Sequence, residues 1–261
     1  MTYEGILFDQ QDGVALITLN RPEKLNALSN RMIFEILDVV DRVAQDGDAR
    51  VLAIRGAGRA FCAGDDLSGM GDFPRPIPPG SSFYDEYQHK LLRALRGLRR
   101  PTIASLHGFC LGMGNDMAMA CDLRVAAEGT KIGEPRILRG MHITTGSTYL
   151  LPRMVGLPRA LGMLMLGELL DAKEAHHLGF VHRLVPPEQL EEATLDLARG
   201  LARGPTRAYA VLKAQVYAEY DMDFEQSMRD MQFYRFTERI EDREEGVKAF
   251  LEKREPEFRG R

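Results

Sequence analysis

The chain has 261 residues, of which 44% are hydrophobic and 28% charged, and its formal net charge is −4. This composition is typical of a globular protein with one large domain, and the charge gives no general attraction to nucleic acid or to an anionic membrane surface. No apolar run approaches the roughly 18 residues of a membrane-spanning helix, and the three cysteines lack the CxxC spacing of zinc or redox sites. We therefore expect a cytoplasmic protein that binds neither nucleic acid nor membrane and holds no metal.

The first 55 residues predict a strand hairpin, then a helix, then a further strand. Apolar residues at 6–9 and 14–20, separated by a polar turn, predict a hairpin at the edge of a sheet. Ser29 is predicted to cap a helix that runs to about residue 45, because Ile33, Ile36 and Val40 keep helical spacing. Residues 51–55 form the next predicted strand. This order predicts a right-handed crossover and a largely parallel sheet.

The rest of the chain divides into a core and a helical end. The proline-rich stretch 68–82 predicts a loop, and residues 71–80 and 141–149 are expected to shape a ligand pocket. Residues 83–98 predict a helix, 102–106 and 123–126 predict strands, and a Met/Ala-rich helix is predicted to start near Asn115. From residue 160 onward the pattern is mainly helical: 160–166, 171–178, 187–203, 205–219 and 224–250. We expect a core over 1–200 and a helical region over 201–261.

Two glycine-rich turns each follow an apolar strand. FCAGDDL places Gly64 before Asp65, and HGFCLGMGNDMAMACD places Gly112 before Met113 at the start of a helix. The first N–H groups of a helix have no intrahelical acceptor and lie at the positive end of its dipole, and glycine lets a ligand approach the backbone closely. Two such turns can aim one N–H each at one oxygen, as in an oxyanion hole. The cysteines in these turns are expected to pack as small side chains, with a nucleophilic role as the alternative.

Four motifs occur in order from about Leu19 to Arg254: NRPEKLNAL, FCAGDDL, GFCLGMGN followed by an acid and a Met/Ala-rich helix, and AFLEKREPEF. Together they resemble the crotonase (enoyl-CoA hydratase/isomerase) superfamily, whereas the nucleotide-binding patterns GxGxxG and GxxxxGK[ST] do not occur. The resemblance implies an α/β fold with repeated ββα turns and a C-terminal helical region. It also implies a homotrimer or a dimer of trimers.

The resemblance assigns roles to the residues of these motifs. In the family, two backbone N–H groups bind a thioester carbonyl and stabilise an enolate, and the matching groups here belong to Asp65 and Met113. Asp116 occupies the position of the first catalytic glutamate of hydratases; alternatively, it only complements the helix dipole. The further residues of the two turns that are expected to contact substrate are Ala63, Gly64, Asp66, Leu67 and Gly112.

The position of the second hydratase glutamate is occupied by Arg136, whose guanidinium cannot act as a general acid or base. Glu134 lies two residues earlier and could replace it, since positions two apart in an extended chain share one side. Alternatively, Glu134 forms a solvated ion pair with Arg136 or Arg139.

Isomerases of the family often carry their acid in the segment that follows, where this chain has Thr144 and Thr145. His142 is the one group there that exchanges protons near neutral pH, although a lone histidine is more often structural. Hydration of an enoyl-CoA thioester is the leading predicted activity. The alternatives are isomerisation or hydrolysis of a cyclic β-keto thioester by a single acid and, from another class, acyl-CoA binding without catalysis.

Binding of coenzyme A is expected at two further places. Lys24, Ala27 and Leu28 lie in KLNAL, which resembles the family segment at the adenine end of CoA. Lys253 resembles a C-terminal lysine that reaches the CoA phosphates, often from a neighbouring subunit. Both lysines could equally be ordinary surface residues. The resemblance implies no metal and no nicotinamide cofactor, and the CoA thioester enters as the substrate.

Overall fold

A six-stranded sheet runs through the centre of the computed structural model, which describes residues 3–69, 73–82, 84–237 and 240–261. The first two strands form the predicted antiparallel hairpin at one edge, and the remaining neighbours pair in parallel. The hairpin and the strands near 51–55, 102–106 and 123–126 are therefore confirmed. In spatial order the strands are β1 (Ile6–Gln11), β2 (Val14–Leu19), β3 (Val51–Gly56), β4 (Thr102–Leu106), β6 (Leu123–Ala127) and β9 (Arg183–Val185).

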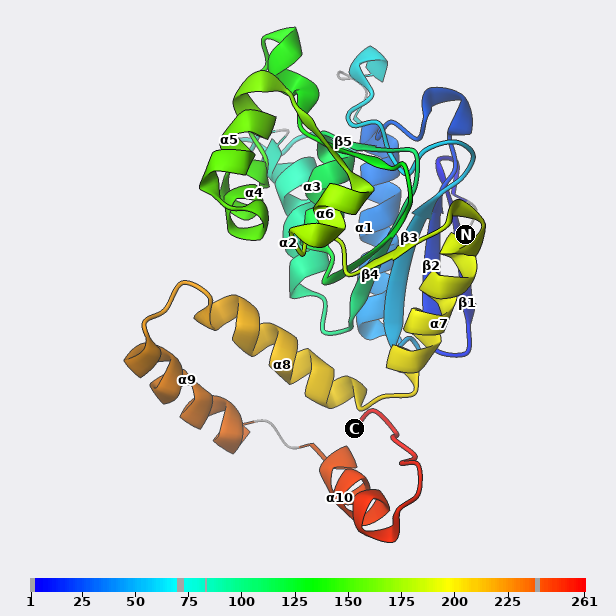
Figure 1. The fold of residues 1–261 in the computed structure, drawn as a ribbon, viewed down its shortest axis with the longest axis vertical. Coiled ribbons are helices and arrows are strands. Elements are labelled where there is room, and N and C mark those ends of the chain that lie inside the picture. Colours follow the sequence, from blue (N-terminus) through cyan, green and yellow to red (C-terminus); the bar gives the residue numbers. More distant parts are fainter. Residues whose placement is uncertain (1–2, 70–72, 83, 238–239) are drawn as a thin grey trace.

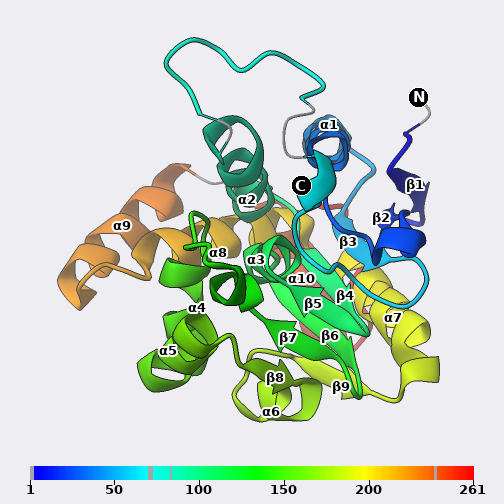
Figure 2. The same ribbon diagram turned by 90° about the horizontal axis from the view of Figure 1, so that it is seen from above.

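Helices cover both faces of this sheet (Figures 1 and 2). One face carries α1 (Asn30–Gln45), α2 (Lys90–Gly97) and α3 (Met113–Ala120), and α7 (Leu190–Ala202) packs on the other. Ser29 caps α1 as predicted, since its side chain accepts a hydrogen bond from the Met32 N–H at 3.2 Å. Because both faces are buried, the central strands read as continuous apolar runs.

A second, three-stranded sheet carries the later glycine turn, and the sequence did not predict it. It consists of β5 (Phe109–Leu111), β7 (Lys131–Gly133) and β8 (Leu169–Asp171). Strands of three residues are too short to show a periodic pattern. The Gly112 N–H donates to the Gly133 carbonyl at 3.0 Å, so this sheet places the residue that follows β7 beside the start of α3.

Several connecting segments differ from the prediction. The helix expected over 83–98 is a π-helical segment, η3 (Tyr84–His89), that continues into α2; residue 83 and residues 70–72 of the expected loop lie outside the described residues. α3 begins two residues before the predicted start, at Met113. The segment after β7 is a 3-10 helix, η4 (Pro135–Arg139), and not an extended chain. Shorter 3-10 turns are η1 (Pro22–Lys24), η2 (Leu67–Gly69) and η5 (Pro187–Gln189).

The last part of the chain is mainly helical, as predicted, apart from β8 and β9. Its helices are α4 (Ser147–Val155), α5 (Leu157–Leu166), α6 (Ala172–His177), α7, α8 (Thr206–Glu219), α9 (Phe224–Thr237) and α10 (Asp242–Glu252). The helix predicted over 224–250 is thus two helices, and residues 238–239 between them lie outside the described part. α8, α9 and α10 extend away from the sheet (Figure 1). Among the described residues, no helix is long and apolar enough to cross a membrane.

Candidate active site

The two glycine turns lie against each other at the start of α3. A methyl group built on Gly64 would lie 3.3 Å from the Leu111 carbonyl oxygen, and one built on Gly112 would lie 3.5 Å from the Gly64 Cα. Both glycines have positive φ, at 109° and 53°, which side chains disfavour. The close approach brings the residues that follow them, Asp65 and Met113, to one place.

The N–H groups of these two residues are not used by the surrounding backbone. Beside Asp65, the backbone bonds run from the Leu28 N–H to the Gly64 carbonyl at 2.8 Å and from the Asp66 N–H to the Leu28 carbonyl at 2.9 Å, while the Asp65 N–H bonds its own carboxyl group. Met113 is the first residue of α3, so its N–H precedes the first intrahelical hydrogen bond. The Met113 N–H is thereby available to a ligand oxygen, and the Asp65 N–H becomes available when its own carboxyl group turns away.

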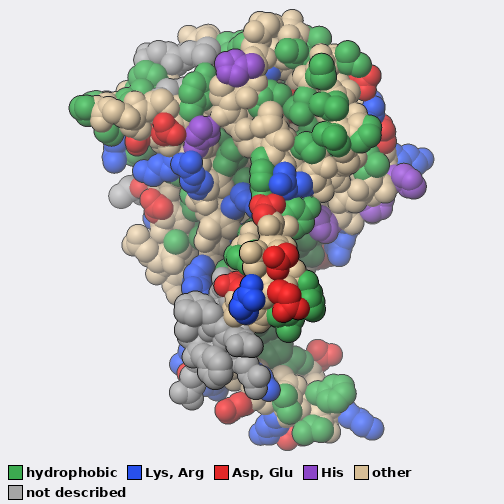
Figure 3. Space-filling view, turned by 90° about the vertical axis from the view of Figure 1, so that its left-hand side faces the viewer, with side chains coloured by type: hydrophobic (Ala, Val, Ile, Leu, Met, Phe, Trp, Pro, Cys, Tyr) green, Lys and Arg blue, Asp and Glu red, His purple; other side chains and the backbone are tan. Residues whose placement is uncertain are grey.

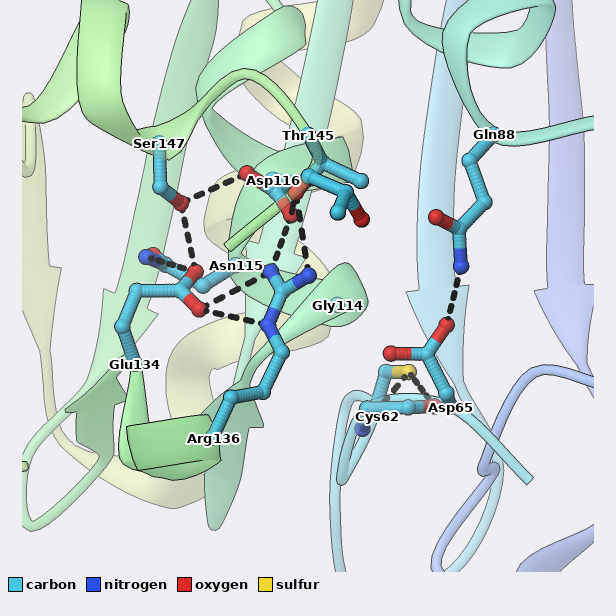
Figure 4. A network of polar contacts seen from close by, with 12 residues as sticks. Cys62, Asp65, Gln88, Gly114, Asn115, Asp116, Glu134, Arg136, Thr145 and Ser147 are labelled. Carbon is cyan, nitrogen blue, oxygen red and sulfur yellow. Dashed lines mark hydrogen bonds and ion pairs between the residues drawn. The ribbon is translucent and has the colours of Figure 1, made fainter. Parts of the chain in front are cut away.

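Asp116 lies on the first turn of α3 and is fully buried. One of its oxygens, Oδ2, accepts hydrogen bonds from Arg136 Nη2 and from the Thr145 hydroxyl. The other, Oδ1, lies 2.6 Å from the Ser147 hydroxyl. Figure 4 shows these partners converging on the carboxyl group from the segments that follow β7. Asp116 therefore does more than complement the helix dipole.

Glu134 belongs to the same buried cluster. Its Oε2 lies 3.0 Å from Arg136 Nε and 2.9 Å from Arg136 Nη2, and its Oε1 lies 3.1 Å from Asn115 Nδ2 and 2.6 Å from the Ser147 hydroxyl. The predicted pairing with Arg136 thus occurs, but the prediction of a solvated pair is wrong. Glu134 is fully buried and Arg136 is 7% exposed, because the 3-10 turn after Glu134 directs the guanidinium inward.

The cluster pairs one cation, Arg136, with two carboxyl groups in the protein interior. Burial, and then the negative charge of Asp116, raise the pKa of Glu134 to about 8. Burial alone would lower the pKa of Arg136, but the Asp116 and Glu134 carboxyl groups outweigh it and raise that pKa. Arg136 is therefore a permanent cation, and burial favours the protonated form of the Glu134 carboxyl group.

A cavity of about 330 Å³ opens beside this cluster. Arg136 lines the cavity and bonds both Asp116 and Glu134, which are fully buried. Of the two segments predicted to shape this pocket, 141–149 contributes Met141, His142 and Thr144, whereas Phe73 and Pro74 of 71–80 line a neighbouring cavity. The lining residues are Leu28, Asn30, Asp65, Asp66, Leu67, Tyr84, Gln88, Arg136, Gly140, Met141, His142 and Thr144.

The side chains of Asp65 and Gln88 form a second polar group in the cavity wall that sequence reasoning missed. Gln88 Nε2 donates to Asp65 Oδ1 at 2.6 Å, and burial raises the pKa of the Asp65 carboxyl group. Figure 4 shows this pair apart from the Asp116 cluster. The acid in FCAGDDL was a visible signal for Asp65, but nothing in the helical pattern marks Gln88.

A larger cavity of about 680 Å³ adjoins the first, because Asp66 lines both. Asp66 Oδ2 pairs with Arg21 Nη2 at 2.7 Å and with Lys24 Nζ at 3.1 Å. Burial opposes ionisation of Asp66, but Ser68, Arg21 and Lys24 more than offset it and lower its pKa. Of the other predicted residues, Ala27 bonds a residue of this wall, since its carbonyl accepts from Arg21 Nη1 at 3.0 Å, whereas the Ala63 N–H donates to the Leu25 carbonyl at 3.0 Å. The larger cavity is lined by Glu4, Gly5, Asn20, Arg21, Glu23, Lys24, Ser29, Arg31, Asp66, Ser68, Phe73 and Pro74.

Lys253 does not approach this site within its own chain. It is the residue that follows α10, and α10 lies at the opposite end of the molecule from α3 (Figure 1). A contact between Lys253 and a ligand in the larger cavity would need a second copy of the chain.

The three cysteines are buried and unpaired. Burial raises the pKa values of the Cys62 and Cys121 thiols to about 12 and also raises that of Cys110. A thiol held in its neutral form is a poor nucleophile, so the expectation that these cysteines pack as small side chains is confirmed.

Comparisons with known proteins cover the whole chain. The family model of enoyl-CoA hydratase/isomerase matches residues 9–261. The 1,2-epoxyphenylacetyl-CoA isomerase of Escherichia coli (strain K12) is 35% identical over 260 residues, and the crotonyl-CoA hydratase of Syntrophomonas wolfei is 31% identical over 260 residues; each alignment covers 99% of both chains. The structure of an enoyl-CoA hydratase from Mycobacterium smegmatis aligns with a TM-score of 0.86 at 32% identity, covering 98% of this chain and 99% of that one. The α/β fold, the paired glycine turns and these full-length matches agree, and the chain belongs to the enoyl-CoA hydratase/isomerase family.

Proposed function

We propose that this chain adds water across the 2,3 double bond of an enoyl-CoA thioester. The observation that carries the proposal is the pair of carboxyl groups, Asp116 and Glu134, that share one buried cluster beside the start of α3. Hydration needs one group to take a proton from water and another to give a proton to carbon, and this cluster holds two acids. The relative named crotonyl-CoA hydratase supports the same reaction.

The thioester carbonyl is proposed to bind between the two glycine turns. Its oxygen would accept hydrogen bonds from the N–H groups of Asp65 and Met113, displacing the Asp65 carboxyl group from its own N–H. The same donors stabilise the enolate that forms as water adds, and each such donor is worth about 3 kcal/mol in a transition state.

Arg136 lies between the two acids and the acyl cavity. Its guanidinium bonds both carboxyl groups, and a methyl group built on Gly112 would lie 3.7 Å from its Nε. Proton transfer between Asp116 and an acyl carbon therefore requires the thioester to displace this guanidinium. In this proposal Arg136 shields the acids from water in the free enzyme and moves aside when substrate fills the cavity.

The larger cavity is proposed to hold the CoA moiety. Arg21, Lys24 and Arg31 line it, and they are proposed to exchange their carboxylate partners Asp66 and Glu4 for the phosphate groups of CoA. The wall shared with the acyl cavity fits a ligand that spans both.

We further propose that residues 1–200 form the catalytic core, that 201–261 form an oligomerisation region, and that the chain assembles as a homotrimer or a dimer of trimers. Figure 3 shows hydrophobic side chains gathered in the upper part of one face and at the lower end of the molecule. Such surface is rarely left open to water. Light scattering should report a trimer or hexamer, with Lys253 brought to a neighbouring site; a monomer would contradict this. Exposed apolar residues of α8 to α10 include Leu212, Val216, Tyr220, Phe224, Met228, Val247, Phe250 and Leu251.

The test is turnover of 2-enoyl-, 3-enoyl- and cyclic β-keto-acyl-CoA thioesters, followed by mass spectrometry. We expect a gain of water on 2-enoyl substrates that falls by at least about 100-fold in both Asp116→Asn and Glu134→Gln. Glu35→Gln is the matched control, because Glu35 is a buried acid on α1 that bonds the Gly5 N–H at 2.9 Å, away from the site. Full hydratase activity in both site variants would contradict the assignment.

A second candidate is double-bond isomerisation or ring hydrolysis by one acid. In this reaction Asp116 would be the working acid, and Glu134, whose oxygens bond Arg136, Asn115 and Ser147, would only hold the cluster together. The relative named 1,2-epoxyphenylacetyl-CoA isomerase supports it. This reaction should respond mainly to Asp116→Asn. Thioester binding without any product would point instead to a binding protein.

A further inference from the structure

The Ser147 hydroxyl lies 2.6 Å from Asp116 Oδ1 and 2.6 Å from Glu134 Oε1 (Figure 4). A hydroxyl has one hydrogen to donate, so it can donate at only one of these two contacts. At the other contact it must accept, and the carboxyl group there must carry a proton. We propose that Asp116 and Glu134 share a single proton through Ser147, and that Ser147 is a positioning residue that passes this proton from one acid to the other.

The remaining hydrogen bonds leave this proton no other place. Asp116 Oδ2 already accepts from Arg136 and from Thr145, and the Thr145 hydroxyl in turn accepts from Arg136 Nη1 at 3.0 Å. Glu134 Oε2 accepts from Arg136 Nε and Nη2. The proton therefore sits on one of the two oxygens that face Ser147.

The charge count gives the same answer independently. Asp116 and Glu134 are fully buried, and Arg136 supplies one positive charge against their two negative charges. The Asp65 carboxyl and the Cys110 thiol also act on the cluster and add no positive charge. An uncompensated buried charge is costly, so one proton on the pair is the favoured state. The raised pKa of Glu134 agrees with it.

This arrangement gives Ser147 a part in the turnover, which rests on the proposed hydration. One acid gives its proton to C2 of the substrate, and the other takes a proton from the water that adds at C3. The proton is then on the wrong acid for the next cycle. The Ser147 hydroxyl restores the initial protonation state: it accepts the proton from the acid that took it from water and donates its own proton to the acid that protonated C2. The total number of protons and the net charge stay the same.

The shared proton can be counted without substrate. Infrared difference spectra of protein with isotope-labelled aspartate and glutamate carboxyl groups, near neutral pH, should show one protonated carboxyl group that both Asp116→Asn and Glu134→Gln abolish. Each variant leaves one acid opposite Arg136, so no extra proton is needed. The proposal is overturned if no protonated carboxyl is seen, or if the signal survives in both variants and so belongs elsewhere, as on Asp65.

The relay is tested with Ser147→Ala, with Ser147→Thr as the variant that restores a hydroxyl. On a 2-enoyl-CoA we expect kcat of Ser147→Ala to fall by about 10- to 100-fold with KM unchanged and an altered pH–rate profile, and the threonine to recover most of both. Ser105→Ala removes another buried hydroxyl, which bonds Thr194 at 2.9 Å, and should change neither kcat nor the pH profile. A wild-type kcat and pH profile in Ser147→Ala would refute the relay.

The infrared measurement tests the shared proton, and the kinetic measurement tests the relay and the proposed hydration on which it rests. Failure of every thioester to react would overturn the proposed function and the relay with it, while the infrared count would still decide whether the two acids share a proton.

Discussion

Gly114, the second residue of α3, is a position where a single methyl group should displace an oxyanion donor. A Cβ built there lies 2.6 Å from the Cys62 Cβ and 2.7 Å from the Cys62 carbonyl oxygen, whereas ordinary carbon contacts are about 3.5–4.0 Å. Cys62 cannot retreat, because its carbonyl accepts the Leu111 N–H at 2.9 Å. In Gly114→Ala the start of α3 must therefore move away from the first glycine turn by about 1 Å.

That displacement acts on the oxyanion donors. An N–H must lie about 2.7–3.1 Å from the developing oxyanion, so a shift of about 1 Å removes most of the contribution of Met113. We expect a loss of about 3 kcal/mol in the transition state, which is about 100- to 1,000-fold in kcat. Overpacking also lowers the free energy of unfolding by about 1–3 kcal/mol.

The assay is hydration of a 2-enoyl-CoA, followed by loss of its absorbance, with thermal unfolding measured on the same samples. Gly200→Ala is the matched control, because Gly200 lies inside α7 and a Cβ built on it meets no atom within 4 Å. The control should keep full activity and gain up to about 1 kcal/mol of stability. If Gly114→Ala is folded and its kcat stays within about threefold of wild type, the assignment of the Met113 N–H as a donor is wrong.

Three other measurements address buried or charged groups. Burial raises the pKa of Glu134 from 4.5 to about 8, so the folded state binds this proton more tightly than the unfolded state between these pH values. The free energy of unfolding should therefore fall as pH rises through this range, by up to about 1.4 kcal/mol per pH unit. Urea titrations of Glu134→Gln should lack this slope, and an equal slope in the variant would contradict the pKa shift. Lys24→Ala should raise KM for a CoA thioester and leave kcat unchanged, since Lys24 lines the larger cavity; an unaltered KM at low salt would place CoA elsewhere. Iodoacetamide should leave Cys62, Cys110 and Cys121 unmodified in the folded chain, because burial shields the thiols and raises their pKa values. Mass spectrometry measures the modification, and an adduct on the folded protein would contradict this expectation.

The sequence alone determined the features that depend on local pattern. The Ser29 cap and the helical spacing after it predict α1 to its last residue, and the apolar run at 102–106 predicts β4. Each glycine turn was also predictable by itself, because glycines after an apolar strand are a local turn signature, whereas the contact between the two turns depends on the tertiary fold.

Only the tertiary structure decided what surrounds the acids. Asp116 bonds Arg136, Thr145 and Ser147, which lie 20 to 31 residues further along the chain, and no spacing rule indicates which of them will reach it. Glu134 was visible as an acid, but its burial follows from a three-stranded sheet too short to predict and from the 3-10 turn after it. Charge pairing depends on which groups long-range packing removes from water together, so the sequence supplied the acids and the fold decided that they act as one cluster.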